Sequence, residues 1–235
     1  MDIIFFGDSL TEGVPGVSYL NILREKLPQH NLINCGKGGD TVISLLKRIR
    51  KMKKPKTYDI AFIWVGVNDI LVHVSLKYPI IKEALHQPWV KNVKEFIDCY
   101  FELLNTVSAY AKKTFTVSPL FIGEDINNKW NKQLEEISAE IELLSMKFKN
   151  VDYIDLRKEF FSELVSKETS PFIVNRSIRD FIIAGLLKNL NYIEEKTKKR
   201  GLYYTFDGVH FNSLGAEIVA NKFLRYIEDE IRGNP

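Results

Sequence analysis

Residues 2–13 read Asp-Ile-Ile-Phe-Phe-Gly-Asp-Ser-Leu-Thr-Glu-Gly, an apolar run that stops at Gly7 and passes directly into polar residues. A short apolar run bounded by a glycine is typical of a buried strand. Beyond it the spacing becomes helical, with one apolar face made of Tyr19, Leu20, Leu23 and Leu27. The stretch predicts a strand, a loop and a helix, with Ser9 just past the carboxyl end of the strand.

The rest of the chain repeats this alternation of strand and helix. Further strands are predicted at 31–34, 58–65, 115–122 and 151–156, and further helices from a cap at Asp40 to Pro55, at about 89–112 and 128–147, and after Ser213. About five such alternations favour a mostly parallel sheet flanked by helices, with the ligand site at the carboxyl ends of the strands. Because no repeat or flexible linker interrupts them, we expect residues 1–235 to form a single domain.

Residues 163–201 are extra to a minimal unit of five strands. An apolar stripe at helical spacing runs through Ile178, Phe181, Ile182, Leu186, Leu190 and Ile193. Such a stripe usually packs against a core, which is the interpretation we adopt. A cap over the active site and a self-association face are the alternatives.

Composition is that of an ordinary soluble globular protein, with 45% hydrophobic and 27% charged residues. The 33 Lys and Arg exceed the 30 Asp and Glu by only three, so the charge indicates no nucleic-acid partner. No run approaches the ~18 apolar residues of a membrane span, and the first apolar stretch is too short for a signal-peptide core. We therefore expect a cytoplasmic protein in which Cys35 and Cys99 are reduced thiols.

One local concentration of charge occurs at residues 47–54, Lys-Arg-Ile-Arg-Lys-Met-Lys-Lys. Cations in the last turns of a helix are favoured by its dipole, so we interpret the run as a solvated helix end. The alternative is a patch that attracts anionic lipid or substrate and would allow transient contact with a membrane. The sequence does not indicate an oligomeric state.

Ser9 requires a base if it is to act as a nucleophile. A serine hydroxyl is poorly nucleophilic near neutral pH, so a base must lie within hydrogen-bond reach and must itself be oriented. His210 is the best candidate, because Asp207 stands three residues earlier and its carboxylate can fold back onto the imidazole. The remaining histidines have no such companion and are interpreted as surface or turn residues: His30, His73 and His86.

Two further loops offer donors for the negative oxygen that forms during acyl transfer. Residues 36–41, Gly-Lys-Gly-Gly-Asp-Thr, follow the second predicted strand and open a helix, so their N–H groups can point at an anion. Residues 66–69, Gly-Val-Asn-Asp, follow the third strand and add an amide side chain. Such loops are also common as simple turns, so only their combination with Ser9 and His210 indicates a site.

Four short blocks together resemble the SGNH (GDSL) hydrolase family in identity, order and spacing. They are Gly-Asp-Ser-Leu at 7–10, Gly39, Gly-Val-Asn-Asp at 66–69 and Asp-Gly-Val-His at 207–210. The resemblance spans residues 3–216, and none of the four blocks departs from the family pattern.

The resemblance implies a role for each matching residue. Ser9 would be the nucleophile, His210 the base and Asp207 the residue that orients it. The N–H groups of Ser9 and Gly39 and the side chain of Asn68 would form the oxyanion hole. Asp8 and Asp69 would be supporting residues.

The same resemblance implies a flavodoxin-like three-layer α/β/α sandwich. The substrate would be a small-molecule ester or thioester, such as an acyl ester, a lysophospholipid or an acetylated sugar. No metal or other cofactor would be needed. Residues 163–201 depart from the minimal family fold and leave the substrate class open. An acyltransferase that uses the same residues on an alcohol, and a non-catalytic binding module of the same fold, are the alternative functions.

Overall fold

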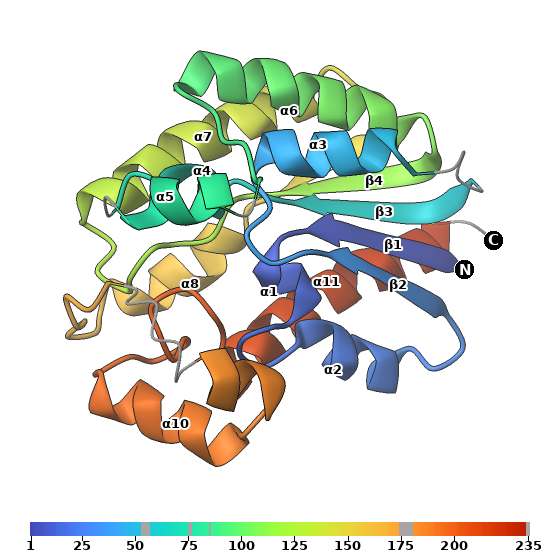
Figure 1. Cartoon of the computed structure of the whole chain (residues 1–235). Helices are drawn as coiled ribbons and strands as arrows, with labels where there is room; N and C mark the ends of the chain where they lie inside the picture. Colours follow the sequence, from blue (N-terminus) through green and yellow to red (C-terminus); the bar gives the residue numbers. More distant parts are fainter. Residues whose placement is uncertain (53–56, 75–76, 85, 174–180, 234–235) are drawn as a thin grey trace.

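The structure is a computed structural model that describes residues 1–52, 57–74, 77–84, 86–173 and 181–233. Its centre is a sheet of five strands, shown in Figure 1: β1 (Asp2–Gly7), β2 (Asn31–Gly36), β3 (Tyr58–Trp64), β4 (Ala111–Val117) and β5 (Val151–Ile154). Every pairing is parallel, in the order β2-β1-β3-β4-β5. This is the flavodoxin-like order of doubly wound sheets, and it confirms the predicted fold.

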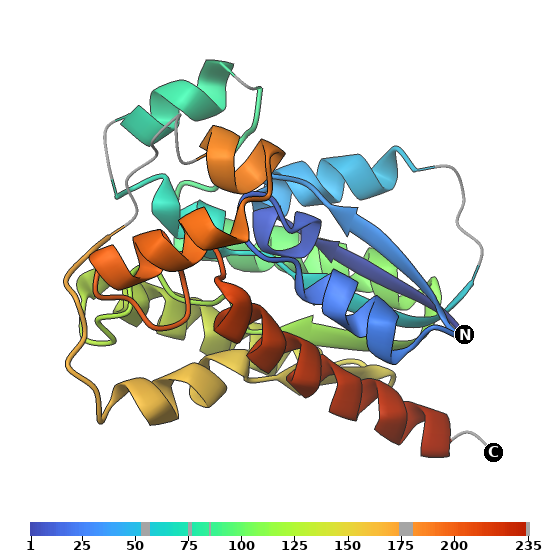
Figure 2. The same cartoon turned by 90° about the horizontal axis from the view of Figure 1, so that it is seen from below.

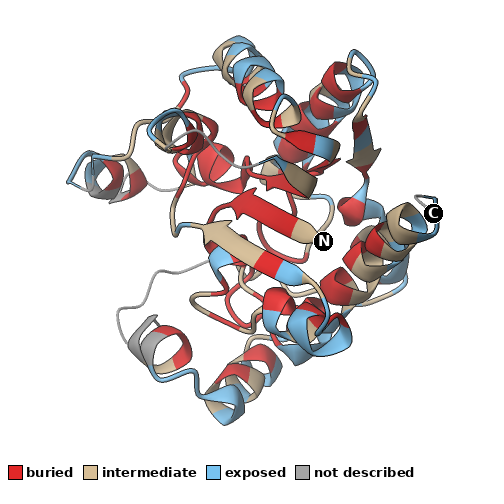
Figure 3. Ribbon diagram, turned by 90° about the vertical axis from the view of Figure 1, so that its right-hand side faces the viewer, coloured by how far each residue is buried: buried red, intermediate tan, exposed pale blue. Residues whose placement is uncertain are grey.

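Helices cover both faces of the sheet and make three layers (Figures 1 and 3). One face carries α3 (Val42–Arg50), α6 (Val93–Ser108) and α7 (Lys129–Ser145), and the other carries α2 (Tyr19–Lys26), α8 (Leu156–Leu164) and α11 (Ser213–Gly233). Two short helices directly follow strand ends, α1 (Ser9–Glu12) after β1 and α4 (Val67–Leu71) after β3, and α5 (Lys77–Ala84) comes after α4. Among the described residues, no helix combines the length and the apolar character needed to cross a bilayer.

Aromatic packing brings the end of the chain to its beginning. Phe223 of α11 lies over Phe62 of β3 with ring centroids 4.8 Å apart, and Phe62 stacks on Phe5 of β1 at 4.7 Å. Nearer the carboxyl ends of the strands, Phe211 stacks on Trp64 at 6.1 Å. Burial of such rings dominates core energetics, so the loop before α11 is held beside the carboxyl ends of β1 and β3.

Several local predictions were wrong. The strand predicted at 115–122 begins earlier, at Ala111, and ends at Val117, while the preceding helix ends at Ser108 rather than near Lys112. Leu120, Phe121 and Ile122 are buried but lie beyond the strand, because Pro119 has no N–H with which to extend the ladder.

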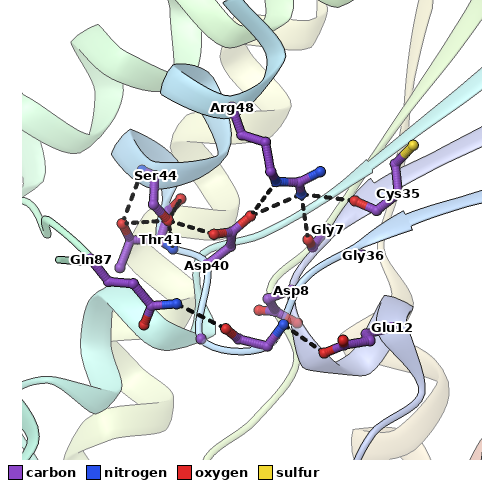
Figure 4. A network of polar contacts seen from close by, with 12 residues as sticks. Gly7, Asp8, Glu12, Cys35, Gly36, Asp40, Thr41, Ser44, Arg48 and Gln87 are labelled. Atoms are coloured by element: carbon purple, nitrogen blue, oxygen red, sulfur yellow. Dashed lines mark hydrogen bonds and ion pairs between the residues drawn. The ribbon is translucent and has the colours of Figure 1, made fainter. Parts of the chain in front are cut away.

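The cap of α3 also differs from the prediction. Thr41 rather than Asp40 is the N-cap, and its hydroxyl accepts the Ser44 N–H. Asp40 instead accepts hydrogen bonds from the Ser44 hydroxyl and from Arg48 (Figure 4). Pro55, the predicted end of this helix, lies outside the described residues.

The extra segment packs against the loop that precedes α11. It contains a π-helix (Phe181–Leu186) and α10 (Leu190–Lys199), which lie toward the carboxyl ends of the strands (Figures 1 and 2). Ile193 is fully buried with Ala184 and Phe206, whereas Leu190 is exposed. Part of the predicted stripe is therefore core. Ile178 lies outside the described residues, as do the side chains of Phe181, Ile182 and Leu186.

Candidate active site

Ser9 is the first residue of α1, directly beyond β1. Asp8 caps this short helix, because its Oδ1 accepts the Leu10 N–H at 3.0 Å. A Cβ on Gly7 would lie 2.2 Å from Thr11 Oγ1, so the sharp passage from strand to helix requires a glycine there. Ser9 is 8% exposed, so most of the residue is buried by the turn that carries it.

The structure brings Ser9, His210 and Asp207 together from opposite ends of the chain. Ser9 Oγ lies 2.9 Å from His210 Nε2, and His210 Nδ1 lies 2.7 Å from Asp207 Oδ2. A carboxylate can only accept, so the second contact makes Nδ1 the protonated ring atom and leaves the Nε2 lone pair facing the hydroxyl. This is the geometry that removal of a serine proton requires.

The environment of Asp207 keeps its carboxylate ionised. Burial alone would raise its pKa, but the charge of His210 and hydrogen bonds from the His210 ring and from the backbone N–H groups of His210 and Val209 hold the pKa below its usual value. Those backbone bonds, at 2.8 Å and 3.0 Å to Oδ1, fold the Asp-Gly-Val-His turn around the carboxylate. The negative charge opposite Nδ1 is therefore present throughout the neutral range.

A buried glutamate that sequence reasoning missed holds the loop before Asp207. Glu124 follows β4 and is fully buried; its carboxylate accepts the backbone N–H groups of Tyr203, Tyr204 and Thr205 at 2.6–2.9 Å and the Thr205 hydroxyl at 2.8 Å. A buried carboxylate is tolerated only with such partners. No sequence signal marks Glu124, because its partners lie about 80 positions further along the chain.

The expected oxyanion donors stand at the ends of neighbouring strands. Ser9 follows β1, Gly39 lies between β2 and α3, and Asn68 is in α4 after β3, and these three strands are adjacent in the sheet. Within the described ranges, neither the Ser9 N–H nor the Gly39 N–H makes a hydrogen bond with the protein. Gly39 adopts φ 76°, a conformation that favours glycine.

Asn68 is aimed by its neighbour Asp8. The Asn68 Nδ2 group donates to Asp8 Oδ2 at 3.1 Å, and because an amide nitrogen carries two hydrogens, the second remains available to a substrate oxygen. Burial raises the pKa of Asp8 to about 7, against the opposing effects of the Leu10 N–H and of the charges of His210 and Lys82. Asp8 therefore titrates close to neutral pH.

Asp69 is a buried residue that connects two helices near the carboxyl ends of the strands. It is fully buried, and its Oδ2 accepts the Val42 N–H at 3.0 Å, which ties α4 to the start of α3. Burial raises the pKa of Asp69 to about 7, although the Val42 N–H and the charge of Lys82 oppose the change. Asp69 thus contacts the scaffold rather than the Ser9 hydroxyl.

Among the described residues, the remaining candidates from the sequence form no hydrogen bond or ion pair with the Ser9 side chain. His73 and His86 are exposed, and His30 lies 3.2 Å from the N-terminal amine. Of the basic run, Arg48 pairs with Asp40 and Arg50 with Glu102. Cys35 and Cys99 are free thiols, and burial raises the pKa of each. In the described part of the chain, no group of His, Cys, Asp and Glu side chains is arranged to hold a metal ion.

The chain belongs to the GDSL-like lipase/acylhydrolase family, whose model matches residues 5–218. The match confirms the resemblance drawn from the four sequence blocks, and it makes the protein an esterase, an enzyme that acts on ester bonds. A search of curated protein sequences gave no significant match.

Solved structures of three esterases and hydrolases share the fold over nearly their whole length. Axe2, an acetylxylan esterase from Geobacillus stearothermophilus, is 18% identical, with 96% of this chain and 93% of Axe2 covered and a TM-score of 0.68. The acetyl xylan esterase AlAXEase is 24% identical, with 97% and 100% covered and a TM-score of 0.65. LAE5, an alpha/beta hydrolase from the metagenome of Lake Arreo, Spain, is 17% identical, with 95% and 93% covered and a TM-score of 0.67.

Proposed function

We propose that the protein hydrolyses carboxylic esters through an acyl-enzyme on Ser9. The observation that carries the proposal is the continuous chain of contacts from Ser9 Oγ to His210 Nε2 at 2.9 Å and from His210 Nδ1 to Asp207 at 2.7 Å. Solved catalytic mutants of Axe2 replace a serine, an aspartate or a histidine by alanine, which is consistent with the same three residue types acting here.

Acylation begins when Ser9 Oγ attacks the ester carbonyl carbon while His210 Nε2 takes its proton. The carbonyl oxygen becomes negative, and the N–H groups of Ser9 and Gly39 and the Asn68 amide donate to it. Asp207 stabilises the imidazolium that forms. When the carbon–oxygen bond to the alcohol breaks, the leaving oxygen takes the proton from His210 and the acyl group stays on Ser9.

Deacylation repeats these steps with water. His210 removes a proton from the water as its oxygen attacks the acyl carbon, and the same donors hold the second oxyanion. The ester bond to Ser9 then breaks, Ser9 Oγ takes the proton back and a carboxylic acid leaves. Each residue thus acts in both halves of the reaction, as in other serine hydrolases.

Acetyl esters of sugars are the substrates to examine first. Axe2 and AlAXEase are named as acetylxylan esterases, and both share the fold with this chain over more than nine tenths of its length. A hydrolysis screen over acyl chains of increasing length and over acetylated xylo-oligosaccharides tests this choice. Preference for acetyl groups supports sugar deacetylation, whereas preference for long chains contradicts it.

Replacement of Ser9 by alanine tests the catalytic proposal. Ser9→Ala is expected to lower kcat on p-nitrophenyl acetate by about 10⁴-fold or more, because the variant lacks the hydroxyl that His210 would deprotonate. Ser162→Ala, on the exposed face of α8, is the matched control and should keep wild-type activity. Wild-type activity in a folded Ser9→Ala protein would exclude Ser9 as the nucleophile.

A further inference from the structure

The loop between β2 and α3 is held by a side chain that neither the sequence blocks nor the catalytic steps include. Gln87 lies beyond α5, and its Nε2 donates to the carbonyl oxygen of Gly38 at 2.9 Å (Figure 4). The Gly38 carbonyl and the Gly39 N–H belong to one peptide unit. In a trans peptide the carbonyl and the N–H point in opposite directions. Gln87 therefore binds the carbonyl side of this peptide, and the Gly39 N–H points away from Gln87.

Other hydrogen bonds, from side chains and from the backbone, fix the neighbouring groups of the same loop. Glu12 Oε2 accepts the Gly38 N–H at 2.7 Å, and the Asp40 N–H bonds to the Lys37 carbonyl at 3.1 Å. Lys82 of α5, only 1% exposed, donates to the Gly39 carbonyl. The donors on both sides of Gly39 are therefore bound within the protein, and among the described residues the Gly39 N–H is not.

The position of Gln87 is itself constrained. Its Oε1 accepts from Lys82 Nζ at 3.3 Å, which aims the Nε2 group at the Gly38 carbonyl. A Cβ on Gly39 would lie 2.7 Å from Gln87 Oε1, so the loop and the amide are in close contact. A hydrogen bond to a carbonyl oxygen also polarises the peptide and strengthens donation by its N–H by about 10–30%.

We propose that Gln87 is a positioning residue for ester hydrolysis: by holding the Gly38 carbonyl, it directs and polarises the Gly39 N–H that receives the oxyanion. The inference rests on the proposed function, since it assumes that the Gly39 N–H has this role. Gln87 acts through the peptide unit and does not touch the substrate. Its removal should therefore slow the chemical step and leave substrate binding almost unchanged.

Two variants test this role. Gln87→Met keeps the length of the side chain and removes the amide, and Gln87→Glu keeps its shape but cannot donate once ionised. Each should lower kcat on p-nitrophenyl acetate about tenfold, less than the 10²–10³-fold loss for deletion of an oxyanion donor itself. KM should change by less than about threefold, and phosphonylation by a fluorophosphonate should slow by the same factor as kcat. Gln133→Met, on the exposed face of α7, is the matched control and should match the wild type.

The outcomes separate this inference from the proposed function. If Ser9→Ala is inactive while both Gln87 variants keep kcat within about twofold of the wild type, the role of Gln87 is excluded and the proposed function stands. A loss of activity that follows a loss of folded protein in both Gln87 variants, measured by circular dichroism, also contradicts a positioning role. If Ser9→Ala keeps full activity, the proposed function itself fails.

Discussion

Asp207 contacts His210 at two points, the ring and the backbone. Its Oδ2 lies 2.7 Å from Nδ1 of the ring, and its Oδ1 accepts the backbone N–H of the same residue at 2.8 Å. The separation of three residues lets one carboxylate set both the path of the loop and the tautomer of the imidazole. This double contact is the physical reason why an Asp-Gly-Val-His block is informative in the sequence.

Asp207→Asn should retain the fold of the loop and lose most of the activity. The amide oxygen can still accept backbone N–H groups, but an amide nitrogen facing Nδ1 favours the tautomer with a proton on Nε2, which cannot take a proton from Ser9. We expect kcat to fall by about 10⁴-fold, the loss measured for the equivalent change in a serine protease. Asp229→Asn, an exposed change on α11, serves as the control. Near-normal turnover in Asp207→Asn would refute this role of the carboxylate.

Asp8→Asn should impair the oxyanion donor without displacing Ser9. Asparagine can keep the acceptor for the Leu10 N–H, but its amide nitrogen would then face the Asn68 amide nitrogen, and two donors repel. The Asn68 side chain loses its acceptor and turns away. We expect kcat to fall about tenfold or more with little change in KM, because the missing interaction forms only in the transition state. A change confined to KM would contradict this account.

The raised pKa of Asp69 should make the free energy of unfolding fall as the pH rises. Its pKa is raised from 3.8 to about 7 in the folded protein, so between those values the native state holds a proton that the unfolded chain has lost. Stability therefore falls as the pH rises from about 4 to 7, at most ~1.4 kcal/mol per pH unit for this group. Asp8 contributes with the same sign.

The Asp69→Asn variant should remove one of these two titrations. Urea unfolding at several pH values between 5 and 7 should show a shallower decline in the free energy of unfolding than in the wild type. Equal slopes for the two proteins would mean that Asp69 is already ionised across this range in the folded state.

Glu124→Gln should weaken the loop that carries Asp207 and His210. The amide oxygen can still serve the Tyr204 and Thr205 donors, but the amide nitrogen meets the Tyr203 N–H, which now donates at 2.6 Å to Oε2. A buried donor left without an acceptor costs about 1–3 kcal/mol. Urea unfolding should show a loss of that size, whereas Glu136→Gln, exposed on α7, should show none. Equal stability of the two variants would disprove this role.

Much of the fold follows from local sequence patterns, and the failures have identifiable causes. The apolar run at 60–65 predicts most of β3, because the part of a strand that is covered on both faces needs apolar residues, whereas Asp59 lies near the less buried start of the strand. The apolar residues Leu120, Phe121 and Ile122 misled the prediction of β4, since burial without pairing leaves the same pattern in a sequence.

The residues of the candidate site also fall into those that the sequence could indicate and those that it could not. Ser9, Asp207 and His210 lie in compact blocks whose spacing reflects local turns, and so the sequence could indicate them. Gln87 and Glu124 act across 49 and about 80 positions, on backbone atoms that every residue possesses. Contacts of this kind impose no pattern near the side chain that makes them, and only the structure reveals them.

Mass spectrometry of the protein after treatment with a fluorophosphonate tests the central claim most directly. The account predicts one covalent adduct, located on Ser9 by peptide mapping, that is absent from Ser9→Ala and formed far more slowly by His210→Ala and Asp207→Asn. An adduct on another residue, or equal labelling of Ser9 when His210 is replaced, would contradict it.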